Sequence, residues 1–225
     1  MKAKTARNGM FASATIILTS VASATVVNFS FSPFEYDYPD ASDLDPISLT
    51  GQLEGSGDDP TGSVIIRVTN SSIPGDDWIT SDAPTITLIA FDGDILSSPD
   101  SWTGSDPSVD FDTDGMNLPG GNNLTPVFSS DFGLGAVPPP AHTGLDPGET
   151  LTINFTGSFD DIYEALYNGD LRIGLHVQQI GDELGNSASY INDAPPPPPD
   201  DEIPEPSSGV LVLLTSLGFL IRRRR

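Results

Sequence analysis

The sequence predicts an all-β domain: an antiparallel β-sandwich of two packed sheets, jelly-roll or immunoglobulin-like, with one short helix. Three observations lead to this prediction. Apolar and polar residues alternate over several short runs, as in strands with one buried face. Clusters of Gly, Pro, Asp, Asn and Ser separate the runs at intervals typical of a sandwich. One segment, after Ser158, has helical spacing instead.

Six runs share the strand pattern, in which every second residue is apolar and faces a core. Their apolar positions are Val27, Phe29 and Phe31; Ile47, Leu49 and Leu53; Val64, Ile66 and Val68; Ile86, Leu88 and Ala90; Leu151, Ile153 and Phe155; and Leu171, Ile173, Leu175 and Val177. Turn-forming clusters at 55–62, 70–77 and 118–123 lie between some of them. We expect eight or nine strands in total.

The helical segment carries its own start and stop signals. The apolar face consists of Phe159, Ile162, Tyr163 and Leu166. Ser158 with Asp161 forms a capping-box pattern before it, and Asn168-Gly169 ends it. We expect this helix to cover one end of the sandwich.

The N-terminus has the pattern of a cleavable signal peptide. Lys2, Lys4 and Arg7 precede an apolar stretch at 12–21 that is short for a membrane span. Ala22 and Ala24 then form an A-x-A cleavage site for signal peptidase. We predict a signal helix over 1–24, export of the chain, and a mature N-terminus at Thr25.

The C-terminus has three elements in a fixed order. Pro204-Glu205-Pro206 is followed by an apolar run at 209–221, for which we expect a hydrophobic helix, and then by Arg222, Arg223, Arg224 and Arg225. Four arginines do not cross a membrane cheaply, so they stay cytoplasmic and the apolar run halts translocation. The alternative is a plain tail anchor that is never processed.

This ending resembles the PEP-CTERM sorting signal of bacteria that make extracellular polysaccharide. The resemblance implies recognition by an exosortase, a membrane protease of transpeptidase type, through Pro204, Glu205 and Pro206. It also implies transient anchoring in the inner membrane, and a final place in the cell envelope, on the outer surface or in the matrix, with exopolysaccharide as a partner. The stretch 144–192 is similar to a β-rich ectodomain that recurs among PEP-CTERM proteins and has no assigned activity.

The chain therefore divides into four parts: a signal peptide at 1–24, a β-sandwich ectodomain at 25–192, a linker at 193–203 and the sorting signal at 204–225. The linker contains five consecutive prolines, Pro195 to Pro199, followed by acidic residues. A polyproline segment is semi-rigid. We expect it to hold the ectodomain off the membrane as a stalk.

Charge and cysteine content exclude several classes of function. All 32 acidic residues lie between Glu35 and Glu205, where Arg67 and Arg172 are the basic residues, so this part has a formal charge of −30. Such a field repels nucleic acid and anionic lipid, which argues against a nucleic-acid role, and attracts cations and basic partners. The absence of cysteine excludes disulfides and cysteine catalysis.

The best metal-binding candidate is Asp110-Phe111-Asp112-Thr113-Asp114-Gly115. Asp110, Asp112 and Asp114 match the first half of a calcium loop. The twelfth position is Gly121 instead of a bidentate glutamate, so Ca²⁺ would need further ligands such as Asp106 or Asp131. The alternative is an acidic surface segment that keeps the protein soluble.

We found no catalytic signature, so the sequence favours a non-enzymatic envelope or matrix protein. His176 alternates with the apolar face of its strand and is expected beside Arg172 and Gln178; His142 lies in a loop. Trp78 and Trp102 lie in polar segments, where they either stack on sugars or cover the core. Two alternatives stay open: a secreted carbohydrate-active hydrolase using an Asp/Glu pair, and a calcium-dependent carbohydrate-binding module.

Overall fold

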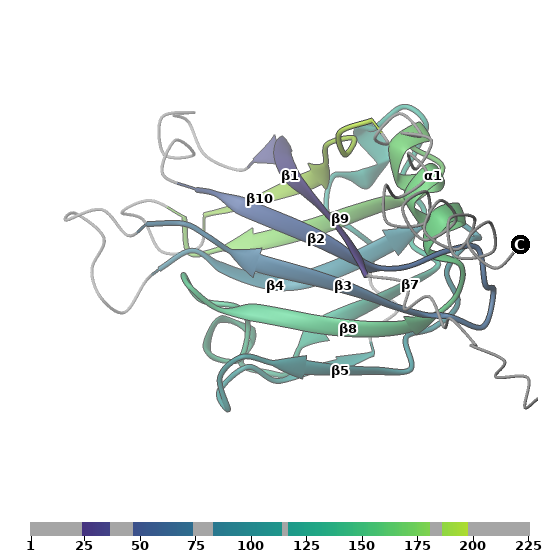
Figure 1. The fold of residues 1–225 in the computed structure, drawn as a ribbon. Helices are drawn as coiled ribbons and strands as arrows, with labels where there is room; N and C mark the ends of the chain where they lie inside the picture. The colour runs from purple at the N-terminus through teal and green to yellow at the C-terminus, as the bar shows by residue number, and fades with distance from the viewer. Residues whose placement is uncertain (1–23, 37–46, 74–82, 114–116, 181–185, 198–225) are drawn as a thin grey trace, which may run out of the picture.

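The structure is a computed structural model that describes residues 24–36, 47–73, 83–113, 117–180 and 186–197. The described residues form ten strands and one α-helix (Figure 1). The elements are β1 (Thr25–Tyr36), β2 (Leu49–Gly55), β3 (Ser63–Asn70), β4 (Thr85–Asp92), β5 (Ser101–Gly104), β6 (Phe111–Thr113), β7 (Phe132–Ala136), β8 (Thr150–Thr156), α1 (Phe159–Asn168), β9 (Arg172–Gln178) and β10 (Ser187–Asn192). The predicted all-β class with one short helix is confirmed.

The strands form one continuous antiparallel sheet, in the order β5-β8-β3-β2-β1-β10-β9-β4-β7-β6. The long strand β1 makes it continuous, because Thr25 to Ser30 pair with β2 whereas Phe31 to Tyr36 pair with β10. A bulge between Pro33 and Glu35 lies in the second half of β1 and bends the strand. The ten described strands therefore form one sheet that curls into a half-barrel, and β1 links its two halves.

The two halves of the curled sheet face each other across one core. Phe155 of β8 lies 5.7 Å from Phe91 of β4 and 5.9 Å from Phe132 of β7, measured between ring centroids. Phe91 and Phe132 stack on each other at 4.6 Å. Side chains from both halves are fully buried between them, including Leu53, Ile66, Ile89 and Leu175. Burial of this apolar surface is the main force that keeps the sheet curled.

Five of the six predicted strands bury the faces that their alternation indicates, but β4 differs. A bulge between Ile86 and Leu88 shifts the pairing with β9. Ile86, Ile89 and Phe91 therefore face the main core, whereas Leu88 and Ala90 belong to a second cluster with Leu118 and Phe128. The predicted core set Ile86, Leu88 and Ala90 is wrong as a single face, because one extra residue reverses the direction of those that follow.

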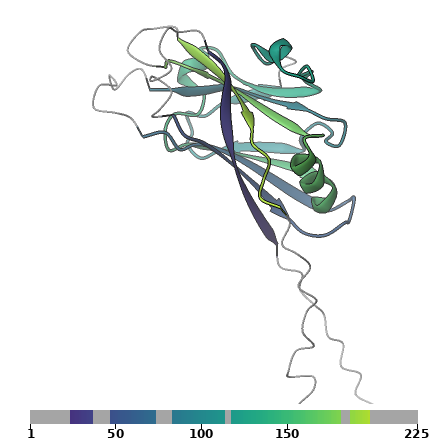
Figure 2. The same ribbon diagram turned by 90° about the horizontal axis from the view of Figure 1, so that it is seen from above.

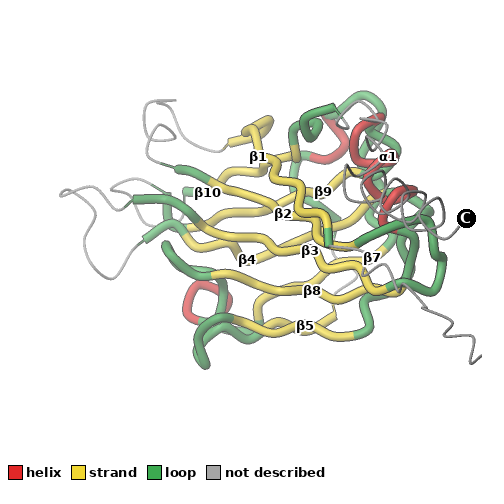
Figure 3. Tube along the Cα trace, viewed as in Figure 1, coloured by secondary structure: helices red, strands yellow, loops and turns green. Residues whose placement is uncertain are grey.

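Helix α1 closes one end of the half-barrel, as predicted (Figure 3). The Ser158 hydroxyl accepts a hydrogen bond from the Asp161 N–H, 3.2 Å away, and Gly169 ends the helix in the left-handed conformation with φ 79°. Its buried face is made by Phe159, Ile162, Tyr163, Ala165 and Leu166.

The chain leaves the domain next to the strand with which it enters. Beyond β10, the Asp193 N–H donates to the Ser30 carbonyl, and its carboxylate accepts from the Ser30 and Ser32 hydroxyls at 2.6 and 2.7 Å. Pro195 is buried, and the Tyr163 hydroxyl of α1 donates to the Pro196 carbonyl. We call residues 193–197 the docked segment; Figure 2 shows it running alongside the first half of β1.

Candidate functional site

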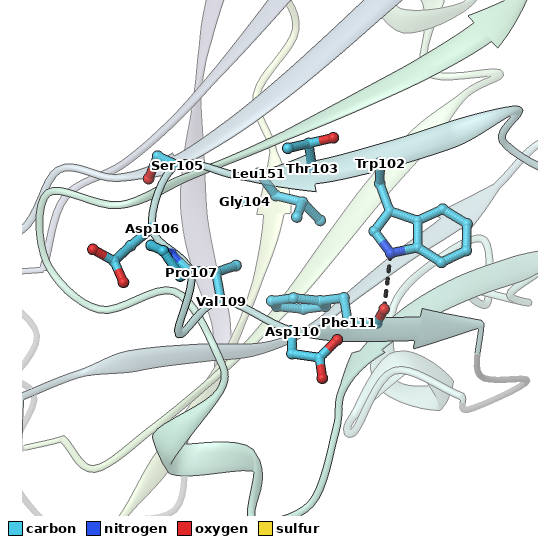
Figure 4. A pocket seen from close by; sticks show the side chains of 10 residues that line it. All are labelled: Trp102, Thr103, Gly104, Ser105, Asp106, Pro107, Val109, Asp110, Phe111 and Leu151. Atoms are coloured by element: carbon cyan, nitrogen blue, oxygen red, sulfur yellow. Dashed lines mark hydrogen bonds between the residues drawn. The ribbon is translucent and has the colours of Figure 1, made fainter.

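The candidate site is a hollow at the seam where the two edges of the curled sheet approach each other. Edge strands β5 and β6 do not pair, but Trp102 of β5 donates its indole N–H to the Phe111 carbonyl of β6 at 2.8 Å (Figure 4). The hollow beside this bond has a volume of about 430 Å³. We call it the seam hollow; its lining residues are Trp102, Thr103, Gly104, Ser105, Asp106, Pro107, Val109, Asp110, Phe111 and Leu151.

The loop that links the two edge strands is held by local hydrogen bonds. Asp106 accepts from the Ser108 hydroxyl at 2.7 Å and from the Ser108 N–H at 2.9 Å. Val109 then packs onto Gly104, where an added Cβ would lie 2.4 Å from the Val109 Cβ. The sequence therefore needs a glycine at the end of β5 for the loop to fold back over the strand.

The hydrogen bonds at Asp106 also set its charge. Two hydrogen bonds, the stronger from the Ser108 hydroxyl and the weaker from the Ser108 N–H, lower the pKa of Asp106, so the carboxylate stays ionised. In Figure 4 the carboxyl groups of Asp106 and Asp110 point away from each other. They do not form the converging pair that hydrolysis of a glycosidic bond requires.

Glu149 is a neighbouring carboxyl whose pKa is shifted upward. Burial raises the pKa of Glu149, and the negative charges of Asp146 and Asp106 raise it further. Its Oε2 accepts from the Asp146 N–H at 2.7 Å. Sequence reasoning missed this residue, although the spacing Asp146-Pro147-Gly148-Glu149 is typical of a turn closed by an acidic side chain. Glu149 does not line the seam hollow.

Trp102 has a structural role. Its ring packs against the main core and its N–H is bonded to Phe111. A tryptophan that stacks on sugars presents a free ring face to solvent, whereas the side chain of Trp102 is half-buried. The core-covering alternative therefore fits this residue better. Trp78 lies outside the described residues.

The predicted calcium motif begins in an extended strand. Asp110 accepts a hydrogen bond from the Val137 N–H through its backbone carbonyl, and Asp112 pairs with Gly135 of β7. Both side chains are exposed, while Phe111 between them faces the core. Alternate residues of a strand are about 7 Å apart, so this backbone does not curl around an ion as a calcium loop does. Asp114 lies outside the described residues.

Neither of the two additional calcium ligands that we considered, Asp106 and Asp131, lies free beside Asp110. Asp106 is bonded to Ser108. Asp131 is six residues before Val137, whose N–H donates to Asp110, so about 20 Å of extended chain separates Asp131 from Asp110. The Asp131 carboxylate accepts from the Gly93 N–H at 2.7 Å. Among the described residues, no group of three or more His, Asp or Glu side chains is arranged to hold a metal ion.

His176 lies on the outer face of β9 with Arg172 and Gln178, as its alternation predicted. Its Nδ1 is 3.3 Å from the hydroxyl of Ser189 on β10. His176 and Ser189 both border a hollow of about 300 Å³, which Glu35 and Gly120 also line, although Ser189 itself is only 1% exposed. Burial lowers the pKa of His176, so the ring is neutral at pH 7. The hydrogen bond between His176 and Ser189 joins β9 to β10.

The predicted processing residues fall almost entirely outside the described part of the chain. Ala22, the sorting motif Pro204-Glu205-Pro206 and the four arginines Arg222 to Arg225 are outside it, whereas Ala24 is the first described residue. Over the described ranges, no helix is long and apolar enough to cross a bilayer.

Comparison with known proteins gave no match: no family model, no curated protein and no solved structure is significantly similar to this chain.

Proposed function

We propose that this chain is an exported, non-enzymatic protein of the bacterial envelope or extracellular matrix, sorted by an exosortase through its PEP-CTERM ending. Signal peptidase removes 1–24, and the C-terminal apolar helix holds the chain transiently in the inner membrane. The exosortase then acts at Pro204-Glu205-Pro206. The order of this motif, the apolar run and the four terminal arginines carries the proposal.

The boundaries of the folded domain support the proposed processing. Strand β1 begins at Thr25, directly after the predicted cleavage site at Ala24. Cleavage there leaves the whole β-rich domain intact. At the other end, β10 ends at Asn192, twelve residues before the sorting motif at Pro204. Both proposed cuts therefore lie outside the described strands.

The docked segment is the first part of the predicted linker, and it packs on the domain, so the proposed stalk begins after it. Because Asp193, Pro195 and Pro196 contact β1 and α1, the proline run leaves the domain from a fixed position. The apolar run at 209 begins twelve residues after Pro197, and an extended chain of that length reaches at most about 40 Å. This length limits how far the domain can stand from the membrane before processing.

We also propose a finer classification of the fold. We assign the curled sheet to the jelly-roll or immunoglobulin-like sandwiches, since its two halves pack face to face around aromatic residues. Exopolysaccharide is the partner that we propose for the displayed domain, on the basis of the PEP-CTERM resemblance.

One observation bears on the alternative of a hydrolase. The environments of Asp106 and Glu149 shift their pKa values in opposite directions, a pattern found in acid/base pairs. However, protein groups already engage both carboxylates: Asp106 accepts from Ser108, and Glu149 accepts from the Asp146 N–H and also interacts with Ser108. These contacts connect the two turns, so the non-enzymatic proposal has better support.

The proposal is tested with matched charge variants in a bacterium that has an exosortase. Glu205→Gln should leave the protein in the inner membrane with its C-terminus uncleaved. Glu202→Gln removes the same charge three residues earlier and should be processed normally. Fractionation followed by mass spectrometry measures both results. Equal processing of the two variants would exclude recognition of the PEP motif.

A further inference from the structure

We propose that the exposed face of α1 is a docking surface for a basic peptide segment that presents at least two positive charges. This surface is distinct from the seam hollow. It consists of two adjoining hollows on either side of the helix, which share Glu164 and Asn168. The proposal does not depend on how the chain is sorted.

The first hollow combines aromatic rings with carboxylates. It has a volume of about 360 Å³ and is lined by Asp160, Tyr163, Glu164, Tyr167 and Asn168. These positions are three or four residues apart, so the side chains lie along one face of the helix. Tyrosine ring faces attract ammonium and guanidinium groups, and adjacent carboxylates add an ionic contact. We call this the aromatic hollow.

The exposed ring of the aromatic hollow is that of Tyr167, which is 41% exposed. Tyr163 beside it is 9% exposed and belongs to the core, where its ring stacks on Phe159 and its hydroxyl donates to Pro196. Tyr163 therefore forms a fixed wall of the hollow, and Tyr167 supplies the aromatic surface that the fold does not cover.

The second hollow is acidic. It has a volume of about 430 Å³, and four carboxylates line it: Asp94, Asp161, Glu164 and Asp170. Asp161 stabilises the N-terminus of the helix dipole, but Glu164 and Asp170 lie near the C-terminal end, where the dipole is negative. The last turn of α1 contains no basic residue. A cation near a helix C-terminus is stabilising, and α1 does not supply one in its last turn.

The described part of the chain has no spare cation to fill these hollows. It contains no lysine, and its two arginines are bound elsewhere: Arg67 pairs with Glu54, and Arg172 pairs with Asp92. Within the described residues, this surface of carboxylates, a tyrosine ring and a helix C-terminus thus has no counter-charge. Charge complementarity selects a basic partner, and two adjoining hollows suit two neighbouring positive side chains.

The test uses the full chain in a non-ionic detergent and a capped tetralysine peptide, with binding measured by calorimetry at about 50 and 150 mM salt. Tetralysine should bind, and its fully acetylated form should not. Tyr167→Ala should weaken binding about three- to tenfold without changing net charge. Glu164→Gln should weaken it about two- to fivefold. Ala and Gln are good helix formers, so both variants should keep the circular dichroism spectrum of the parent.

The control is Asp110→Asn, which removes one exposed carboxylate at the distant seam hollow and should change the affinity less than about twofold. Two results would overturn the proposal. Equal affinities of Tyr167→Ala and the unchanged protein would mean that the peptide senses only the overall negative field. Equal binding of the acetylated peptide would mean that positive charge is not recognised. Neither result would affect the proposed sorting of the chain.

Discussion

Asn70 offers the sharpest test of how the two halves of the sheet are held together. This residue ends β3 and is fully buried. Its side-chain N–H groups donate to the carbonyl oxygens of Pro84 at 2.6 Å and Leu145 at 2.9 Å, and its Oδ1 accepts from the Ser72 N–H at 3.2 Å. Asn70→Ala removes three hydrogen bonds. The Leu145 carbonyl keeps its hydrogen bond from the Ile86 N–H, whereas the Pro84 carbonyl and the Ser72 N–H lose this partner.

The expected loss follows from these contacts. At about 1 kcal/mol for each buried hydrogen bond, Asn70→Ala should lower the free energy of unfolding by about 3 kcal/mol. For a domain of this size the melting temperature should fall by about 6–12 °C. Urea unfolding followed by circular dichroism measures the effect, with an unchanged slope against urea concentration.

The control is Asn28→Ala, which makes the same substitution on the exposed side of β1. Asn28 accepts one hydrogen bond from Gln52 at 3.0 Å, so its loss should cost less than about 0.5 kcal/mol. If Asn70→Ala and Asn28→Ala destabilise the protein equally, the argument that Asn70 joins the two halves is refuted.

Two further predictions concern pH and the docked segment. Because burial raises the pKa of Glu149, the folded state favours its neutral form. The stability that this preference contributes is fully present below the group's ordinary pKa of 4.5 and is lost as pH rises through the folded-state pKa. Glu149→Gln should therefore raise the melting temperature by about 1–2 °C at pH 7 and not at pH 3.5; an equal change at both pH values would contradict this. Asp193→Ala removes the carboxylate that accepts hydrogen bonds from Ser30 and Ser32, and it should lower the free energy of unfolding by about 1–2 kcal/mol. The control Asp201→Ala, in the linker, should leave the free energy of unfolding unchanged. Equal effects of the two variants would show that the docked segment adds no stability.

The sequence predicted the strands that carry a strong alternating pattern. Val64, Ile66 and Val68 of β3 and Leu151, Ile153 and Phe155 of β8 face the core as expected. The helix was also predictable, because Ser158 and Gly169 are local signals at its two ends. In these segments the local preference and the tertiary packing agree.

Other strands could not be predicted from alternation. β5 reads SWTG and β7 reads FGLGA, too short or too rich in glycine to show a period of two. β10 reads SASYIN and buries Ala188, Ser189 and Tyr190 in succession, because the segment at 117–130 covers the outer face of the sheet. Burial on both faces removes the pattern that a half-exposed strand shows.

The single sheet and the candidate site depend on contacts between distant residues. The sequence does not reveal that β1 exchanges partners from β2 to β10 near Phe31, since the exchange depends on a strand that lies more than 150 residues further along the chain. Similarly, the pKa of Glu149 is raised first by burial and then by the negative charges of Asp146 and of Asp106, which is more than 40 residues away. Only the folded arrangement brings these groups together.

The most direct test of the central claim is the intact mass of the unchanged protein, recovered from the envelope and medium of a bacterium with an exosortase. We predict a species that begins at Thr25 and ends near Pro204-Glu205-Pro206. A species that begins at Thr25 but retains Arg225 would contradict exosortase sorting and would make the C-terminus an ordinary tail anchor.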